Sequence, residues 1–290
     1  MDLIKMKVIT TNEAVEAVSN ILMEQDAQGI QIEEGNNKVN VITYFPSSTD
    51  ILKIQKLVTA KTQALKEYGL NPGEAKVVIN EVKQSDWANK WESYYHVERV
   101  TRFLTVVPAW EDYQPETGDQ ILIKLDPKMA FGTGTHPTTK MSMQALENVI
   151  RGGEKVFDVG TGSGVLSIVA QKLGAGKIRA WDNDPVAIES AAKNLELNDD
   201  VHDIDLGVNS LLDGISDKAD VVVANMLAEV LLPLIPQVNE RLNKSGKLIL
   251  AGIYADKLND IKLALDEQNF VIEQISELGN WRSIVAIKGE

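Results

Sequence analysis

The sequence contains no cysteine among its 290 residues. Disulfide bonds, thiolate catalysis and cysteine-ligated zinc are therefore excluded, and a reducing cytoplasm is the expected location. Histidine is also scarce, and His96 and His202 show no spacing typical of metal ligands, so we predict no metal site. No apolar run approaches the roughly 18–20 residues that span a bilayer, and residues 1–7 lack the features of a signal peptide. We expect a soluble cytoplasmic protein.

Basic residues are outnumbered, since 29 Lys and Arg stand against 42 Asp and Glu and give a formal net charge of −13. Proteins that bind nucleic acid as their main partner usually carry the opposite sign, because contacts to phosphate drive that binding. An acidic surface attracts a basic partner, although acidity also serves solubility alone. We therefore expect no direct reader of nucleic acid, and a basic macromolecule stays open as the partner.

The elements predicted for residues 1–85 follow the order strand, helix, strand, strand, helix, strand. Periodicity and turn residues place them at Leu3–Thr10, Thr11 to Gly29, Ile30–Glu34, Val39–Phe45, Asp50–Tyr68 and Ala75–Val82. Ser47, Ser48 or Thr49 is expected to cap the second helix, and Gly69 to end it. This order is typical of a small α+β ferredoxin-like domain, a common platform for binding macromolecules.

Residues 86–118 have a different composition, because aromatic side chains gather there: Trp87, Trp91, Tyr94, Tyr95 and Trp110. Such a cluster can form a binding surface. We interpret it as an aromatic-rich linker whose rings pack between two domains.

From residue 119 to residue 290, apolar strands alternate with amphipathic helices, which indicates a doubly wound α/β sheet. Buried parallel strands are predicted at Val156–Val159, Lys177–Trp181, Val221–Ala224 and Lys247–Ala251. Helices are predicted at Val165–Lys172, Pro185–Asn194, Glu229–Asn239 and Asp256–Gln268. The last two strands, Phe270–Glu277 and Trp281–Ile287, are joined by so short a link that they must form an antiparallel hairpin.

A glycine-rich turn between a predicted strand and a predicted helix is the first candidate site. Asp158 lies in the strand, and Gly160, Gly162 and Gly164 follow at alternating positions. Glycine lets the backbone approach a ligand closely, and the next helix presents its positive end to an anionic group. A phosphate-binding loop is excluded because Gly-Lys-Ser/Thr is absent, and the G-x-G-x-G spacing differs from the G-x-G-x-x-G of NAD-binding domains.

Two further candidates stand at the ends of later strands. Asp182 lies 22 positions after Gly160, where doubly wound domains place a carboxylate that binds ribose hydroxyls. Capping of the next helix is the alternative role, and it suits Asp184 better than Asp182. Asn225 falls at the carboxyl end of a strand, the edge where open α/β sheets bind ligands. Three such groups on successive strand ends predict a single pocket.

These features resemble class I S-adenosylmethionine-dependent methyltransferases, which share the G-x-G-x-G turn after an acidic strand end, the acidic residue at Asp182 and the terminal hairpin. The segment Asp126–Thr139 (DPKMAFGTGTHPTT), the Trp-rich linker and Asn225–Glu229 (NMLAE) are similar to the methyltransferase family of ribosomal protein L-eleven (L11). The resemblance covers essentially the whole chain and is strongest from Trp87 to Asn225. Lys128 departs from it, because a small residue is expected there.

The resemblance implies a seven-stranded catalytic domain (119–290) and a substrate-recognition domain (1–85). It implies methyl transfer from S-adenosylmethionine to lysine side-chain and N-terminal amines of a basic ribosomal protein, free or bound to the ribosome. It places cofactor contacts on Thr138, Gly160, Asp182 and Asn225. The expected cofactor site is completed by Phe131, Asp158, Gly162 and Gly164.

The residues after Asn225 favour an aliphatic acceptor amine. Met226-Leu227 follows it, and the Pro-Pro-aromatic sequence that stacks on flat acceptors is absent. We predict Asn225 to be catalytic, with its carbonyl orienting the neutral amine. The segment Phe131–Pro137 can be a plain turn, a lid or a loop that brings His136 as a base, and Gly132 and Gly134 favour the lid.

Three other functions can be set against this one. An NAD-type oxidoreductase is disfavoured by the glycine spacing and the terminal hairpin. A methyltransferase acting on RNA or a small molecule is the main alternative, and the acidic charge and the separate N-terminal domain weigh against it. A scaffold with a vestigial fold is disfavoured by the intact glycine triad, Asp182 and Asn225.

Overall fold

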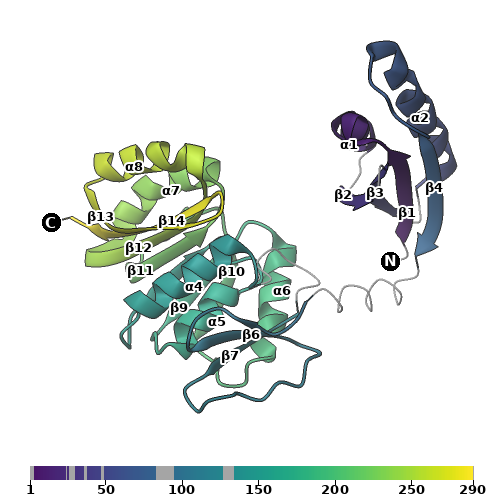
Figure 1. Cartoon of the computed structure of the whole chain (residues 1–290). Helices are drawn as coiled ribbons and strands as arrows, with labels where there is room; N and C mark the ends of the chain where they lie inside the picture. Colours follow the sequence, from purple (N-terminus) through teal and green to yellow (C-terminus); the bar gives the residue numbers. More distant parts are fainter. Residues whose placement is uncertain are drawn as a thin grey trace. The chain divides into compact units, whose positions relative to one another are not determined.

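The computed structural model describes residues 3–23, 25, 30–35, 38–46, 49–82, 95–126 and 134–289. The chain divides into two compact units, Met1–Tyr94 and Tyr95–Glu290, coloured along the chain in Figure 1. The second unit starts inside the range predicted as a linker, because residues 104–108 form a fully buried strand and not a connector. Trp87, Trp91 and Tyr94 of that range lie outside the described residues.

The first unit is an antiparallel four-stranded sheet with two helices. Its strands lie in the order β2-β3-β1-β4: β1 (Leu3–Thr10), β2 (Gln31–Gly35), β3 (Lys38–Pro46) and β4 (Lys76–Val82). Helices α1 (Val15–Met23) and α2 (Ile51–Ala64) share one apolar core with alternate strand residues such as Met6, Val8 and Phe45. Short 3₁₀ turns at Asn12–Ala14 and Leu65–Tyr68 adjoin the two helices.

The capping of α2 differs from the prediction. Asp50, and not Thr49, caps the helix, since its carboxylate accepts a hydrogen bond from the Lys53 amide at 3.3 Å, while Ser47 and Ser48 lie outside the described residues. The expected end at Gly69 is confirmed, because this residue adopts a left-handed conformation with φ 80° after the 3₁₀ turn.

The second unit is built on a seven-stranded sheet in the order β10-β9-β8-β11-β12-β14-β13. The strands are β8 (Val156–Val159), β9 (Ile178–Asp182), β10 (Ile204–Val208), β11 (Ala219–Asn225), β12 (Leu242–Tyr254), β13 (Phe270–Leu278) and β14 (Trp281–Lys288). Strands β8 to β12 are mutually parallel, and β14 runs antiparallel to both of its neighbours. Sequence analysis missed β10, because Asp205 and Gly207 interrupt its apolar residues.

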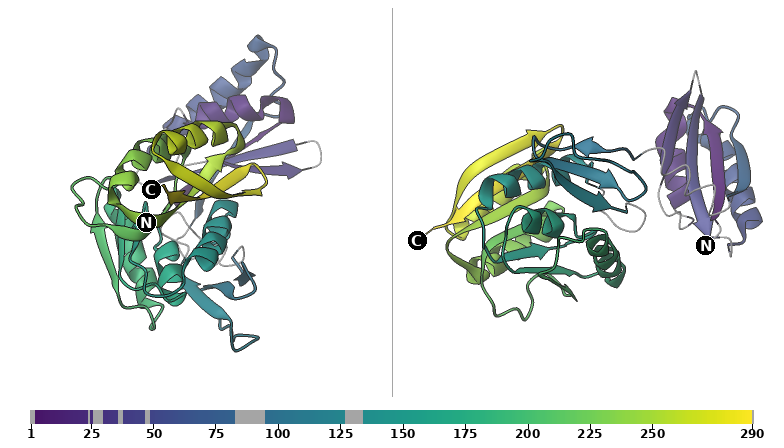
Figure 2. Two further views of the ribbon diagram at one scale, coloured as in Figure 1. Left: turned by 90° about the vertical axis from the view of Figure 1, so that its left-hand side faces the viewer. Right: turned by 90° about the horizontal axis from the view of Figure 1, so that it is seen from below.

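Helices cover both faces of this sheet (Figures 1 and 2). On one face lie α4 (Pro137–Val149), α5 (Val165–Lys172) and α6 (Pro185–Glu196), and on the other α7 (Ala228–Arg241) and α8 (Leu258–Glu267), with a 3₁₀ turn at Ala255–Lys257 before α8. Strand side chains alternate between the two faces, so Val221 and Val223 pack on the α4–α5 side while Val222 and Ala224 pack under α7. Such double burial explains why the central strands read as continuous apolar runs.

A small three-stranded sheet extends the α4–α5 side. It consists of β5 (Glu98–Arg99), β6 (Leu104–Pro108) and β7 (Ile121–Leu125), and its buried side chains join the core around α5. Among the helices of the described residues, none is both long and apolar enough to cross a membrane.

Candidate functional site

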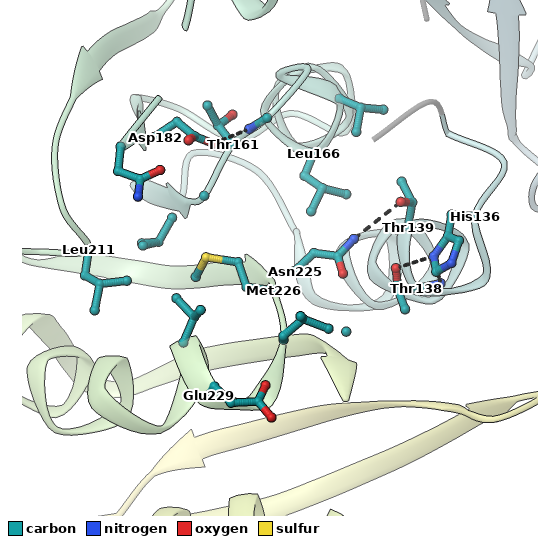
Figure 3. A pocket seen from close by; sticks show the side chains of 18 of the residues that line it. His136, Thr138, Thr139, Thr161, Leu166, Asp182, Leu211, Asn225, Met226 and Glu229 are labelled. Carbon is teal, nitrogen blue, oxygen red and sulfur yellow. Dashed lines mark hydrogen bonds between the residues drawn. The ribbon is translucent and has the colours of Figure 1, made fainter. Parts of the chain in front are cut away.

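A cavity of about 800 Å³ opens where β8, β9 and β11 end (Figure 3). Five of the residues predicted to contact the cofactor line it together: Thr138, Gly160, Gly162, Asp182 and Asn225. The carboxyl ends of neighbouring parallel strands meet at one sheet edge, which is why groups more than sixty residues apart converge here. The predicted single pocket is thus confirmed, while the cofactor contacts of its residues stay a prediction.

The glycine turn has a backbone shape that other residues rarely adopt. Gly160, Gly162 and Gly164 all have positive φ, at 76°, 55° and 79°. The amides of Gly160 and Thr161 donate to the carbonyl of Trp181 at 2.8 and 2.9 Å, which ties the turn to the end of β9. A Cβ on Gly160 would lie 2.5 Å from the sulfur of Met226, so any side chain there would have to displace Met226.

Asp182 holds the turn from the side of β9. One carboxylate oxygen accepts a hydrogen bond from the Gly162 amide at 2.9 Å, and the other accepts from the Asp184 amide at 3.1 Å. Each oxygen keeps a lone pair for a further donor in the cavity. Asp184 instead caps α6 by accepting from the Val186 amide at 2.9 Å, so the division of roles between these two carboxylates follows the sequence interpretation.

Asp158 does not line the cavity, although the sequence places it among the cofactor contacts. It is buried beneath the turn, where one oxygen accepts from the hydroxyls of Thr161 at 2.8 Å and Ser167 at 2.7 Å. The other oxygen has no hydrogen-bond partner among the described residues. Burial raises the pKa of Asp158 to about 6, against the opposing effect of these hydroxyls. Its position supports a role in shaping the turn from below.

Gly164 also lies behind the cavity wall. It is the residue before α5, and a Cβ there would approach the Cβ of Ala191 on α6 to 3.1 Å. The contact gives Gly164 a packing role between two helices, and its expected contact with a cofactor stays a prediction. Phe131 lies outside the described residues.

Asn225 ends β11 and faces the start of α4. Its side-chain nitrogen donates to the hydroxyl of Thr139 at 3.3 Å (Figure 3). Helix α4 begins at Pro137, and His136 caps it: Nδ1 lies 3.4 Å from the Thr138 amide and 2.8 Å from the Thr138 hydroxyl. Burial lowers the pKa of His136, which favours the neutral ring. Since Nδ1 is engaged in this cap, the geometry favours a structural role for His136 over that of a general base.

Several lining residues escaped the sequence analysis. Trp281 comes from the terminal hairpin, Glu229 from the first turn of α7, and Asn209, Ser210 and Leu211 from the end of the missed strand β10. Had β10 been identified, the polar residues directly after it would have indicated a fourth strand end that contributes to the pocket. Trp281 packs edge-on against His136 with ring centroids 5.1 Å apart, a contact that no local pattern predicts.

The cavity combines three kinds of chemistry. Backbone turns and the Asp182 carboxylate suit a polar, sugar-bearing ligand, and Val159, Leu166 and Leu211 give apolar walls. The Asn225 amide stands at the end near α4 and can orient a polar group. Within the described residues, no three His, Asp or Glu side chains are close enough to bind a metal ion together.

Comparison with known proteins gives a consistent result. The sequence profile of the family described as "Ribosomal protein L11 methyltransferase (PrmA)" matches residues 2–289. Curated proteins named ribosomal protein L11 methyltransferase are 47% identical in Limosilactobacillus reuteri, over 99% of this chain and 98% of that protein, and 41% identical in Bacillus cereus, over 97% and 98%. A crystal structure of a ribosomal protein L11 methylase from Lactobacillus delbrueckii subsp. bulgaricus covers 68% of this chain and 100% of its own, with 42% identity and a TM-score of 0.65.

Proposed function

Because the chain belongs to the ribosomal protein L11 methyltransferase (PrmA) family, we propose that it transfers methyl groups from S-adenosylmethionine to amines of protein L11. One observation carries the proposal: the glycine turn, Asp182 and Asn225 line a single cavity at the ends of three strands. Cofactor and acceptor must meet in one place for direct transfer, and this cavity offers different chemistry at its two ends.

The residues present fit the cofactor. The Asp182 carboxylate and the neighbouring Asn209–Leu211 segment would hold the nucleoside, and the glycine turn with Thr138 would hold the amino-acid part. Because Gly160 has no side chain, a ligand can approach the backbone closely at this position. When bound, S-adenosylmethionine supplies an electrophilic methyl group on a positively charged sulfur. The chain's own contribution is then alignment, which in favourable cases supplies roughly 7–11 kcal/mol.

The acceptor proposed is an aliphatic amine, either a lysine side chain or an N-terminal amino group. Lysine is ordinarily protonated, with a pKa near 10.4, and an ammonium has no lone pair for attack. Apolar surroundings favour the neutral amine, and Trp281, Leu227 and Val230 provide such surroundings at the cavity. The Asn225 carbonyl would accept a hydrogen bond from that amine and turn its lone pair toward the methyl group.

Glu229 would guide the acceptor to the cavity. It lies on the rim in the first turn of α7, and among the described residues it forms no ion pair. An exposed carboxylate beside apolar side chains suits a cationic head on an aliphatic stem. The net charge of −13 acts in the same direction for a basic ribosomal protein.

The first unit is proposed to recognise the substrate, and Tyr95–Glu290 to carry the catalysis. The described residues that line the cavity all lie between His136 and Trp281, which supports the assignment of catalysis to Tyr95–Glu290. Ferredoxin-like domains commonly bind macromolecules, and the strand order β2-β3-β1-β4 supports that assignment. A cytoplasmic location and action on free or ribosome-bound protein complete the proposal.

The test is incubation of purified enzyme with labelled S-adenosylmethionine and isolated L11, followed by mass spectrometry of the product. Label on lysine or N-terminal nitrogen is expected, and transfer to no protein would contradict the proposal. RNA and small-molecule extracts serve as competing acceptors, since transfer to these alone would favour the alternative substrate class. Calorimetric titration with S-adenosylmethionine and, separately, NADH distinguishes the methyltransferase from an oxidoreductase.

A further inference from the structure

We propose that Thr139 is a positioning residue: it fixes the Asn225 amide so that the amide oxygen faces the acceptor amine. We further infer that this contribution disappears for the third methyl transfer to the same nitrogen. The inference rests on the proposed function and deepens it, because it assigns a step-dependent role to Thr139, which lines the cavity but is not among the proposed cofactor contacts.

One hydrogen bond determines the orientation of the Asn225 amide. The Asn225 nitrogen donates to the Thr139 hydroxyl at 3.3 Å, joining β11 to the first turn of α4 (Figure 3). Thr139 is fully buried. The Asn225 oxygen accepts from no donor among the described residues, and Asn225 lines the cavity. Thr139 accepts from one of the two N–H groups of that nitrogen, which fixes the amide so that its oxygen is left to accept from a ligand.

Without such a partner the amide orientation would be poorly fixed. The terminal torsion of asparagine is broad and roughly two-fold, so the side chain can turn either its oxygen or its nitrogen toward the cavity. A nitrogen facing an amine would bring two donors together and would compete for the amine lone pair that must attack the methyl group. The Thr139 hydroxyl thus selects the productive orientation.

Helix α4 holds Thr139 firmly in place. His136 caps its first turn, Pro137 occupies its first position, and the Ser142 hydroxyl donates to the Thr138 carbonyl at 2.9 Å. The helix packs against β12 and β14 of the central sheet. A hydroxyl anchored in this way can orient a neighbouring amide without moving during the reaction.

The chemistry of successive transfers makes the role step-dependent. In each transfer the amine lone pair forms the new N–C bond, and the bonding pair between methyl and sulfur stays on the sulfur. An ammonium proton must then leave to water before the next transfer. A neutral primary amine has two N–H groups, a monomethyl amine has one, and a dimethyl amine has none. The Asn225 oxygen can therefore accept an N–H in the first two transfers only.

The experiment measures single-turnover rates at saturating S-adenosylmethionine with acceptors that carry no, one or two methyl groups on the target nitrogen. Thr139→Val removes the hydroxyl but keeps the shape, and we expect it to slow the first two transfers about tenfold, the effect of one hydrogen bond. The dimethylated acceptor should react at nearly the wild-type rate. Thr139→Ser should restore the first two rates, and cofactor affinity should be unchanged in both variants.

A double variant provides the decisive comparison. In an Asn225→Ala background, Thr139→Val should cause no additional loss, because the two residues act through one hydrogen bond. The matched control is Thr105→Val in β6, which removes a fully buried hydroxyl that accepts a hydrogen bond from Gln120 at 2.6 Å and does not line the cavity. It should leave all three rates unchanged, so a loss in Thr139→Val alone cannot be ascribed to deletion of a buried hydroxyl as such.

Three results would overturn the inference: wild-type rates in Thr139→Val with the unmethylated acceptor, equal slowing with all three acceptors, or additive losses in the double variant. If the wild-type enzyme does not use the dimethylated acceptor, the double variant and the serine rescue decide. Transfer by the wild-type enzyme to no acceptor at all would instead refute the proposed function, so the two failures are distinguishable.

Discussion

Replacement of Asp182 by alanine should weaken cofactor binding roughly 100-fold. In the folded protein this carboxylate already accepts the amides of Gly162 and Asp184 at 2.9 and 3.1 Å, so its oxygens are fixed at the cavity wall. Two ribose hydroxyls donating to a charged acceptor contribute about 1.5 kcal/mol each at the lower bound, and about 3 kcal/mol in total corresponds to that loss of affinity.

The neighbouring carboxylate supplies the matched control. Asp184→Ala removes the N-cap of α6 and should cost about 1 kcal/mol of stability, while Asp184 does not line the cavity. Calorimetric titration with S-adenosylhomocysteine should therefore give nearly the wild-type Kd for Asp184→Ala. Thermal melting of both variants would show that a loss of stability alone does not produce the loss of affinity.

A second ligand identifies the contact itself. An analogue of S-adenosylhomocysteine that lacks both ribose hydroxyls should bind the wild-type protein about as weakly as the intact ligand binds Asp182→Ala, and the variant should not distinguish the two ligands. The reasoning would be refuted if Asp182→Ala bound the intact ligand with a Kd close to wild type, or if it still preferred the ligand that carries the hydroxyls.

Three further predictions concern the support of the cavity and its rim. Burial raises the pKa of Asp158 from 3.8 to about 6, so its contribution to stability is present below about pH 4 and is lost as pH rises through about 6. In urea unfolding, the free energy of unfolding of the wild type should fall by up to about 3 kcal/mol from pH 4 to pH 7, and this fall should be absent in Asp158→Asn. The same pH dependence of that free energy in both proteins would contradict the prediction. Gly164→Ala should lower the free energy of unfolding by about 1–2 kcal/mol, because φ is 79° and the new Cβ would lie 3.1 Å from the Cβ of Ala191. An unchanged urea midpoint would show that α5 and α6 can move apart at no cost in stability. Glu229→Gln should raise the KM for a basic protein acceptor several-fold at low salt, with little change in kcat. The difference in KM should shrink at high salt, because salt screens the attraction exerted by an exposed carboxylate. A loss confined to kcat would instead assign Glu229 to the chemical step.

The order of elements in the second unit was largely predictable from local pattern. Residues 156–159 form a strand and residues 165–172 a helix with the predicted bounds, because a buried apolar run ends at a glycine turn that only one backbone shape satisfies. Strand β10 was missed, since Asp205 and Gly207 weaken its pattern at the edge of the sheet. The Asn209–Leu211 part of the cavity was lost with it.

Sequence could predict a site residue only where its place at the end of a strand determines where its side chain lies. Asp182 and Asn225 end parallel strands, so their place at the sheet edge follows from topology. Asp158 and Gly164 belong to the same glycine motif, yet one is buried beneath the turn and the other packs against α6. The motif alone does not predict what each of its residues contacts, because those contacts depend on the twist and packing around the turn.

The sequence alone determined the α/β alternation, the glycine turn and the strand ends where polar groups stand, since each depends on backbone preferences within a few residues. Only the tertiary structure decided that Thr139 binds Asn225 and that Trp281 reaches the cavity from the terminal hairpin, where it packs against His136. These contacts join segments far apart in the chain, and a hydrogen bond or ring contact forms only where the packing of whole elements brings its two atoms within a few ångströms of each other.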